Sequence, residues 1–264
     1  MALSNPAFGK RSFPVATATQ TRPGMTTEQL DELYGRAAAG PAETDRMSYE
    51  DTIVKTLVTL GFVLAGGVVG FLFPQLYLPF LFIGLALALV NIFKKQPSAP
   101  LVIAYAVAEG IFLGGISRVV ESVQPGIIGQ ALLGTGIVFG VTLALFANGK
   151  VRATKKATKV FIIAGTAYAI FSVLNLVLQL TGVNQDAWGL HSASIFGIPL
   201  GLIIGPLAIL MAAYSLVLDF TSVQQGVQSG APRKWGWKAA FGLVLTIVWL
   251  YVEMLRLISI FRSN

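Results

Sequence analysis

The chain alternates between long apolar runs and short polar links. A helix needs about 20 mainly apolar residues, at about 1.5 Å each, to cross the roughly 30 Å hydrocarbon core of a bilayer. Seven runs reach this length: Ile53 to Phe73, Leu76 to Phe93, Leu101 to Val120, Ile127 to Ala147, Val160 to Leu180, Ile195 to Leu218 and Ala239 to Phe261. Their apolar residues are continuous and do not alternate at every second position. We therefore predict an all-α membrane protein, folded as one seven-transmembrane helical bundle.

The polar N-terminal part predicts a second region with different properties. Residues 1 to 47 read as a cytoplasmic, largely disordered tail, and residues 48 to 264 as the transmembrane domain. Within the tail, "TTEQLDELYGRAAAG" fits a short amphipathic helix, either resting on the membrane or solvated. The tail has no short apolar core with a cleavage site, so we expect no cleaved signal peptide.

Charge adds an orientation to this bundle. Only 12% of the residues are charged, against about 25% in soluble domains, and the net charge is +7. If the runs alternate in direction, nearly all of the 19 Lys and Arg residues fall on one side. The exceptions are Arg118, Arg256 and Arg262. This bias predicts a cytoplasmic N-terminus and an external C-terminus. The basic excess is thus a topology signal that calls for no nucleic-acid partner, with attraction to anionic lipids as a by-product.

Small residues and prolines predict how the helices pack and bend. Glycines spaced four apart permit close approach of two helix backbones. They are Gly66 with Gly70, Gly110 with Gly114, Gly136 with Gly140, and Gly197 with Gly201 and Gly205. Pro199 and Pro206 make the sixth run the best candidate for a kinked helix, because each removes a helical hydrogen bond.

Four charged residues fall in or at the end of the apolar runs, where each costs about 2.5 to 3.5 kcal/mol on insertion scales. They are Glu109, Asp219, Glu253 and Arg256. Counting about 1.5 Å per residue, Glu109 lies near the middle of its run and Glu253 about 5 Å outward of the middle. The same count places Asp219 at the cytoplasmic mouth, roughly 19 Å from the middle of a straight sixth helix.

These charges allow a structural interpretation and a functional one. Glu253 and Arg256 are three residues apart and could pair with each other, while Asp219 could simply end its helix. Glu109 has no cation within four residues, so it must find a partner, water, an ion or a proton. Carboxyls that share a site titrate as a coupled pair, and ionised carboxylates with freed backbone carbonyls suit calcium. The functional interpretation is a proton-gated cation site, with calcium as a transported ion and no resident cofactor.

Enzyme classes find little support. The chain has no cysteine, a single histidine and no HExxH segment, and Ser117 in "GGIS" has no neighbouring base. We expect His191 to be a solvated residue of an external loop. Asn175 and Gln179 share a helix face and favour interhelical hydrogen bonds over ligation. We therefore do not expect an enzyme.

The acids and the last apolar run together resemble the Bax-inhibitor (TMBIM) superfamily, in its bacterial YccA-like branch. The resemblance rests on "AYSLVLDFTSVQQG" and "GAPRKWGWKAAFGLVLTIVWLYVEMLRLI", with "YAVAEGIFLGGIS" weaker, and covers roughly residues 48 to 264. It implies a multi-pass protein of the cell inner membrane whose last helix is central, wrapped by the other six. It also implies a pH-sensitive calcium leak controlled by two proton-sharing acids, one on each of the last two helices.

This chain departs from that two-acid pattern. Asp219 matches the first acid, but "MLRLI" aligns Arg256 with the family arginine and so places Thr246 at the second acid. Glu253 is the nearest acid, seven residues later on the same helix stripe. Either the sensor is lost or it has moved to Glu109 and Glu253, and we favour the move. Relatives of this branch also suggest another function, in which a non-transporting protein modulates a membrane protease or another partner through its tail.

Overall fold

The computed structural model describes residues 45–184, 186 and 188–263. Its long helices are α2 (Tyr49–Leu72), α3 (Tyr77–Phe93), α4 (Ala99–Val123), α5 (Ile127–Ala147), α6 (Lys155–Leu180), α7 (Leu200–Gln228) and α8 (Trp235–Ser263). The shorter elements are η2 (Pro74–Leu76), η3 (Gly189–His191), β1 (Ser194–Ile195) and β2 (Ile198–Pro199). Among these described residues, seven helices, η2 counted with α3, are long and apolar enough to cross a membrane. The predicted seven-helix membrane bundle is therefore confirmed.

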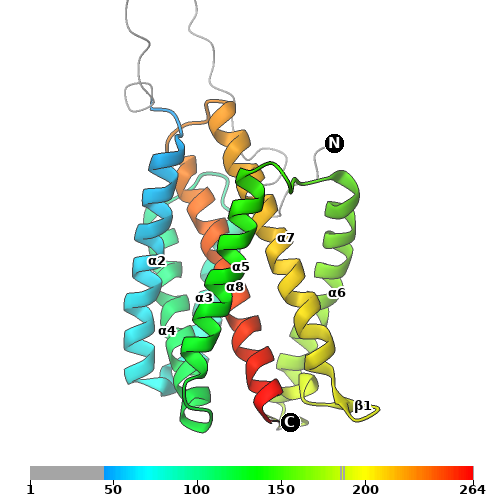
Figure 1. Cartoon of the computed structure of the whole chain (residues 1–264). Coiled ribbons are helices and arrows are strands. Elements are labelled where there is room, and N and C mark those ends of the chain that lie inside the picture. Colours follow the sequence, from blue (N-terminus) through cyan, green and yellow to red (C-terminus); the bar gives the residue numbers. More distant parts are fainter. Residues whose placement is uncertain (1–44, 185, 187, 264) are drawn as a thin grey trace, which may run out of the picture.

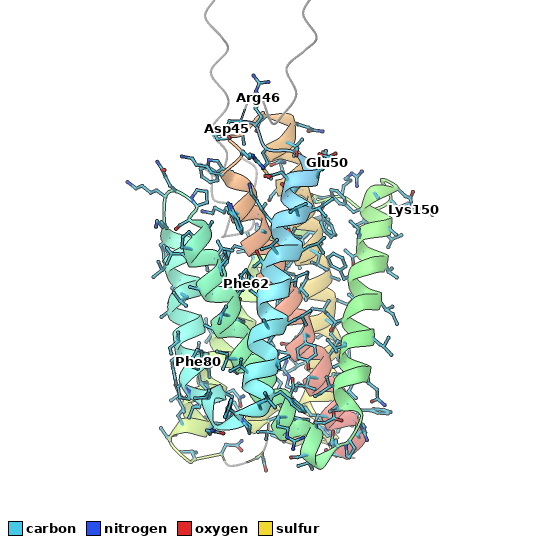
Figure 2. The ribbon with its side chains drawn as sticks, turned by 90° about the vertical axis from the view of Figure 1, so that its left-hand side faces the viewer. Asp45, Arg46, Glu50, Phe62, Phe80 and Lys150 are labelled. Carbon is cyan, nitrogen blue, oxygen red and sulfur yellow. The ribbon has the colours of Figure 1, made fainter. Side chains whose placement is uncertain are left out.

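The distribution of polar and apolar side chains also fits a membrane-spanning bundle. Figure 2 shows Asp45, Arg46 and Glu50 gathered at one end, while Phe62 and Phe80 lie along the sides. We call the end that carries Asp45, Arg46 and Glu50 the basic end. The links and helix termini at that end contain Lys94, Lys95, Lys155, Lys156 and Arg233. Exposed apolar side chains along the flanks suit lipid contact.

The helix α8 is central, as the family resemblance implied (Figure 1). In its apolar window 61% of the residues are buried, against 0% for α6. The helices α2, α4, α5 and α7 pack against α8, whereas α3 packs on α4 and α6 lies at the edge beside α7. Four helices therefore surround α8 directly, and α3 and α6 lie outside them.

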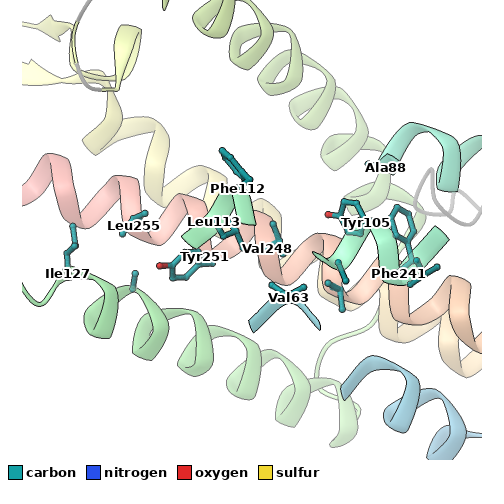
Figure 3. Close-up of a cluster of buried hydrophobic side chains, with 14 residues drawn as sticks. Val63, Ala88, Tyr105, Phe112, Leu113, Ile127, Phe241, Val248, Tyr251 and Leu255 are labelled. Carbon is teal, nitrogen blue, oxygen red and sulfur yellow. The ribbon is translucent and has the colours of Figure 1, made fainter. Parts of the chain in front are cut away.

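Two buried apolar clusters line α8. One contains Leu216, Phe220 and Leu243 and extends to Met47 at the basic end. In the other, the Tyr105 ring packs edge-on against Phe241, with ring centroids 5.0 Å apart (Figure 3). Met47 is buried and its N–H donates to the Ala231 carbonyl at 2.7 Å. The bundle therefore takes in residues 45–47 of the predicted tail, whereas the expected helix in "TTEQLDELYGRAAAG" lies outside the described residues.

Close glycine packing is confirmed for α2 against α4. A Cβ on Gly70 or Gly114 would overlap backbone atoms of the opposite helix, and Gly66 and Gly110 are equally tight. Gly201 and Gly205 face side chains of α8. The prediction was wrong for Gly136 and Gly140 of α5, which meet no atom within 4 Å and face outward, and for Gly197, which precedes α7 and also meets no atom within 4 Å.

The largest departure from the predicted elements is in the sixth spanning helix. The residues from Ser194 to Pro199 form the hairpin β1–β2, with Phe196 (φ 54°) and Gly197 (φ 81°) at its turn. Pro199 therefore precedes α7 and cannot kink it, while Pro206 lies inside the helix. The helix also continues to Gln228, ten residues beyond the predicted end. Its middle falls near Ala213 and Tyr214, so Asp219 is not at the end of the helix.

Candidate functional site

Asp219 lies inside the bundle and not at its mouth. Its side chain is 0% exposed, and it is only about 8 Å along the axis from the middle of α7. Our placement of Asp219 at the end of its helix was wrong, because the apolar run marked both ends of the helix incorrectly. The helix continues for nine residues beyond this buried carboxyl, so Asp219 does not serve merely to end the helix.

Asp219 accepts a hydrogen bond from Thr246 of α8. The Thr246 hydroxyl donates to the Asp219 carboxylate at 2.6 Å, and Ser215 Oγ lies 3.2 Å from the same hydroxyl oxygen. A threonine hydroxyl has one proton, so Ser215 is the donor in the second bond. Thr246, aligned by sequence with the second acid of the family, thus faces Asp219 directly. Hydrogen bonds among the described residues thus join one acid and two hydroxyls at this site.

Glu253 and Arg256 form a buried ion pair one third of the way up α8 from its C-terminus. Glu253 is 2% exposed and Arg256 is 7% exposed. The other Glu253 oxygen accepts from the indole N–H of Trp249 at 3.0 Å and from the Tyr168 hydroxyl at 2.5 Å. The pairing that the sequence allowed within α8 is present, and it is completed by a residue of α6.

Tyr168 is the functional candidate that sequence reasoning missed. Its hydroxyl donates to Glu253 and accepts from Arg256, so one α6 side chain bridges both charges. The available signal was a tyrosine within the apolar run Val160 to Leu180, since a buried phenol needs a partner. The periodicity of the run did not indicate which helix would supply the hydrogen-bond partners of the Tyr168 hydroxyl.

Glu109 faces a different neighbour. It is half-buried on α4, with its carboxylate against Gly84 of α3, where an added Cβ would lie 2.6 Å from Oε2. A larger residue at position 84 would displace the end of the Glu109 side chain. Glu109 lies against α3, whereas Glu253 is bonded to α6, and no contact between them occurs among the described residues.

The three predicted acids do not converge. Asp219 bonds to Thr246, which precedes Glu253 by seven residues, or about 10 Å along α8. Within residues 45–184, 186 and 188–263, no group of three or more acidic or histidine side chains is placed to hold a metal ion. The expected transfer of the two-acid sensor to Glu109 and Glu253 is therefore not supported, because the two carboxylates face different helices.

His191 is buried, contrary to the expectation of a solvated loop residue. It is 1% exposed and packs edge-on against Phe171 of α6, with ring centroids 4.9 Å apart. Burial and, secondly, the charge of Arg256 lower the pKa of His191 to about 4. The imidazole is therefore neutral near pH 7.

The polar pair on α6 holds this loop in place. Asn175 accepts from the Leu190 N–H at 2.6 Å, and Gln179 donates to the Asp186 carbonyl at 3.2 Å. Gly189 has φ +58° and leaves no space for a Cβ beside Asn175. The expected hydrogen bonds of Asn175 and Gln179 exist, but they join α6 to the loop and not to another helix.

The seven-helix bundle with buried charges along its central helix defines a multi-pass integral membrane protein in contact with the lipid bilayer. Comparison with family models then specifies the family. Residues 5–263 match the family described as Bax inhibitor 1 like, and the chain belongs to that family.

The family match also changes the limits of the resemblance. It begins at residue 5, so the interpretation that the first 47 residues lie outside the family was wrong. A search of curated proteins found no match to the chain.

Proposed function

We propose that this protein is a cation leak of the bilayer, with calcium among the ions it passes, and that protonation of Asp219 controls it. The observation that carries the proposal is a fully buried carboxylate near the middle of α7, hydrogen-bonded to a hydroxyl of the central helix. Family membership supports the same function, because the resemblance implies an acid at this position.

The chemistry of the Asp219 site follows from its oxygen atoms. When Asp219 is ionised, its carboxylate and the hydroxyls of Thr246 and Ser215 present oxygen ligands of the kind that hard cations prefer. Protonation removes the negative charge and makes the carboxyl a donor. Control by one acid replaces the proton sharing between two acids that the family resemblance implied.

The Glu253–Arg256 pair has a supporting role in this proposal. The two charges neutralise each other, and Tyr168 and Trp249 donate hydrogen bonds to the Glu253 carboxylate. We assign it to fixing α6 against α8. Glu109, which faces α3, provides a separate carboxylate that does not enter the Asp219 site.

Calcium flux into liposomes tests the proposal. Purified protein in liposomes that contain a calcium-sensitive dye should give a flux that changes between about pH 6 and 8. Asp219→Asn should flatten this pH profile, whereas Asp186→Asn, an exposed acid outside the helices, should leave it unchanged. A flux no greater than that of empty liposomes overturns the leak. The competing proposal, a non-transporting modulator of a membrane protease, then takes precedence.

A further inference from the structure

A groove of about 930 Å³ runs between α6 and α7. On α6 its lining alternates between large side chains, such as Phe161 and Phe171, and small ones that leave space between them. The small ones include Ala157, Ala164 and Ala167. On α7 it is lined by Ile204, Leu207 and Met211. The groove is almost entirely apolar along its length, so it favours an apolar occupant.

The groove faces the bilayer and not the interior of the bundle. Thr158 is the one buried residue of α6, and its other side chains are partly or fully exposed. Figure 1 shows α6 at the edge of the bundle beside α7. Leu207 and Leu210 on the facing helix are 57% and 66% exposed. In a membrane the molecules with direct access to this groove are lipids.

One end of the groove is polar and positively charged. Lys156, Thr154 and Tyr214 line it there, and the Tyr214 hydroxyl bonds to Thr158 at 2.8 Å. Lys155 and Lys159 are exposed close by, and the segment from Lys150 to Lys159 contains no acid. A positive cluster at the edge of an apolar groove complements a phosphate headgroup above an acyl chain.

We infer that the α6–α7 groove binds one anionic glycerophospholipid. Its phosphate contacts Lys156 and Thr154, and one acyl chain lies along Ala157, Ala164 and Ala167. From Lys156 to Phe171 the groove extends about 22 Å, more than the roughly 15 Å of one leaflet's hydrocarbon. An acyl chain that is anchored at the headgroup level and spans one leaflet therefore lies within the groove along its whole length.

Size argues against a protein helix as the occupant. A helix about 10 Å wide and 22 Å long occupies roughly 1,700 Å³, well above the volume of the groove. An occupant of the groove also contacts Tyr168, which bonds to the Glu253–Arg256 pair. The ring of Tyr168 lines the groove, while its hydroxyl holds Glu253 and Arg256. The lipid would therefore support the side chain that joins α6 to α8. This inference does not rest on the cation leak.

Native mass spectrometry of the purified full chain tests the site, with dioleoyl phosphatidylglycerol and dioleoyl phosphatidylcholine as probes. The wild-type protein should bind phosphatidylglycerol more tightly. Lys156→Ala should reduce that preference about fivefold, the equivalent of about 1 kcal/mol for one Lys at an anionic lipid surface. Lys155→Ala, one residue away and outside the groove lining, should reduce it less.

A second pair of variants tests the groove itself. Ala164→Trp should fill it and abolish tight binding of either lipid, whereas Ile163→Trp, on the exposed face of the same helix, should not. Helical circular dichroism and gel filtration check that the variants fold. Equal binding of the two lipids by the wild type, an unchanged preference in Lys156→Ala, or retained binding in Ala164→Trp would overturn the inference. A particle of two chains without lipid would also overturn it, in favour of a second copy.

Discussion

At the scale of single residues, Thr246 joins α8 to α7 through two hydrogen bonds. Its hydroxyl donates to Asp219 and accepts from Ser215, so both α7 side chains depend on one oxygen of α8. All three residues are buried, where an unsatisfied polar group is costly. A threonine at this position keeps the α7–α8 hydrogen bond without adding a second negative charge.

Thr246→Val should therefore destabilise the protein by about 1 to 3 kcal/mol, because it removes a hydrogen-bond donor to a buried carboxylate. The measurement is unfolding in detergent solution. Thr166→Val provides the matched control, since Thr166 is exposed and bonds only to its own helix. Equal losses in both variants would show that the Asp219–Thr246 bond carries no special stability.

Thr246→Asp should change the pH dependence of calcium flux instead. It places two carboxyls within hydrogen-bonding reach, and two such groups share a proton and titrate in separate steps. The flux profile should become two-stepped or broader than that of the wild type. A profile identical to the wild type would argue against Asp219 as the controlling acid.

The Glu253–Arg256 pair makes a different prediction, because removing one partner leaves an uncompensated buried charge. Glu253→Gln alone should cost about 3 to 5 kcal/mol of stability. The double variant Glu253→Gln with Arg256→Met should cost less than the sum of the two single changes. A double-mutant cycle measures this coupling, and additive losses would contradict a tight pair.

His191 predicts how stability depends on pH at the same end. Its pKa falls from 6.5 to about 4 on folding, so the unfolded chain binds more protons between these values. Its contribution to stability is complete above pH 6.5 and is lost as the pH falls toward 4. His191→Gln should reduce the difference in melting temperature between pH 7 and pH 5. An unchanged difference would mean that His191 is not buried neutral.

At the scale of elements, the α2–α4 pair is held by backbone approach and the α6–α7 pair is not. Gly70 and Gly114 lie directly against the opposite backbone, which no side chain can move aside. The helix α6 instead has small residues along a groove and is joined to α8 by Tyr168. We expect α6 to be the spanning helix that separates most easily from the bundle.

Glycine substitutions test the first of these contacts. Gly114→Ala should force α2 away from α4 and lower the melting temperature strongly, because the added methyl would overlap the Gly67 carbonyl. Gly136→Ala on α5 meets nothing within 4 Å and should stabilise its helix by up to about 1 kcal/mol. Similar melting temperatures for the two variants would contradict the packing.

At the scale of the whole molecule, the placement of basic residues predicts its orientation. The chain lacks cysteine, so a single introduced thiol can report which side it occupies. Gln96→Cys lies in the α3–α4 link at the basic end, and Val183→Cys lies in the loop after α6. In intact cells a membrane-impermeant maleimide should label Val183→Cys and leave Gln96→Cys unlabelled. The reverse pattern would mean the opposite orientation.

The sequence by itself determined the class of protein and most of its elements. A spanning helix is a local property, because length and continuous apolarity are sufficient to cross a bilayer, and each of the seven runs overlaps a spanning helix of the described residues. The alignment of Arg256 also placed Thr246 at the family's second acid position, and Thr246 indeed faces Asp219. The glycine spacing indicated the α2–α4 contact for the same reason, since it depends on one helix face.

Only the tertiary structure decided which buried groups meet. A hairpin takes up the first residues of the sixth apolar run, and the helix continues into polar residues beyond its last. The helix α7 therefore begins and ends later than predicted, and Asp219 is not at its end. The rotation of α4 turns Glu109 toward α3, and the position of α6 brings Tyr168 to Glu253. These outcomes depend on how complete helix surfaces pack against each other, which the spacing of residues within one helix does not specify.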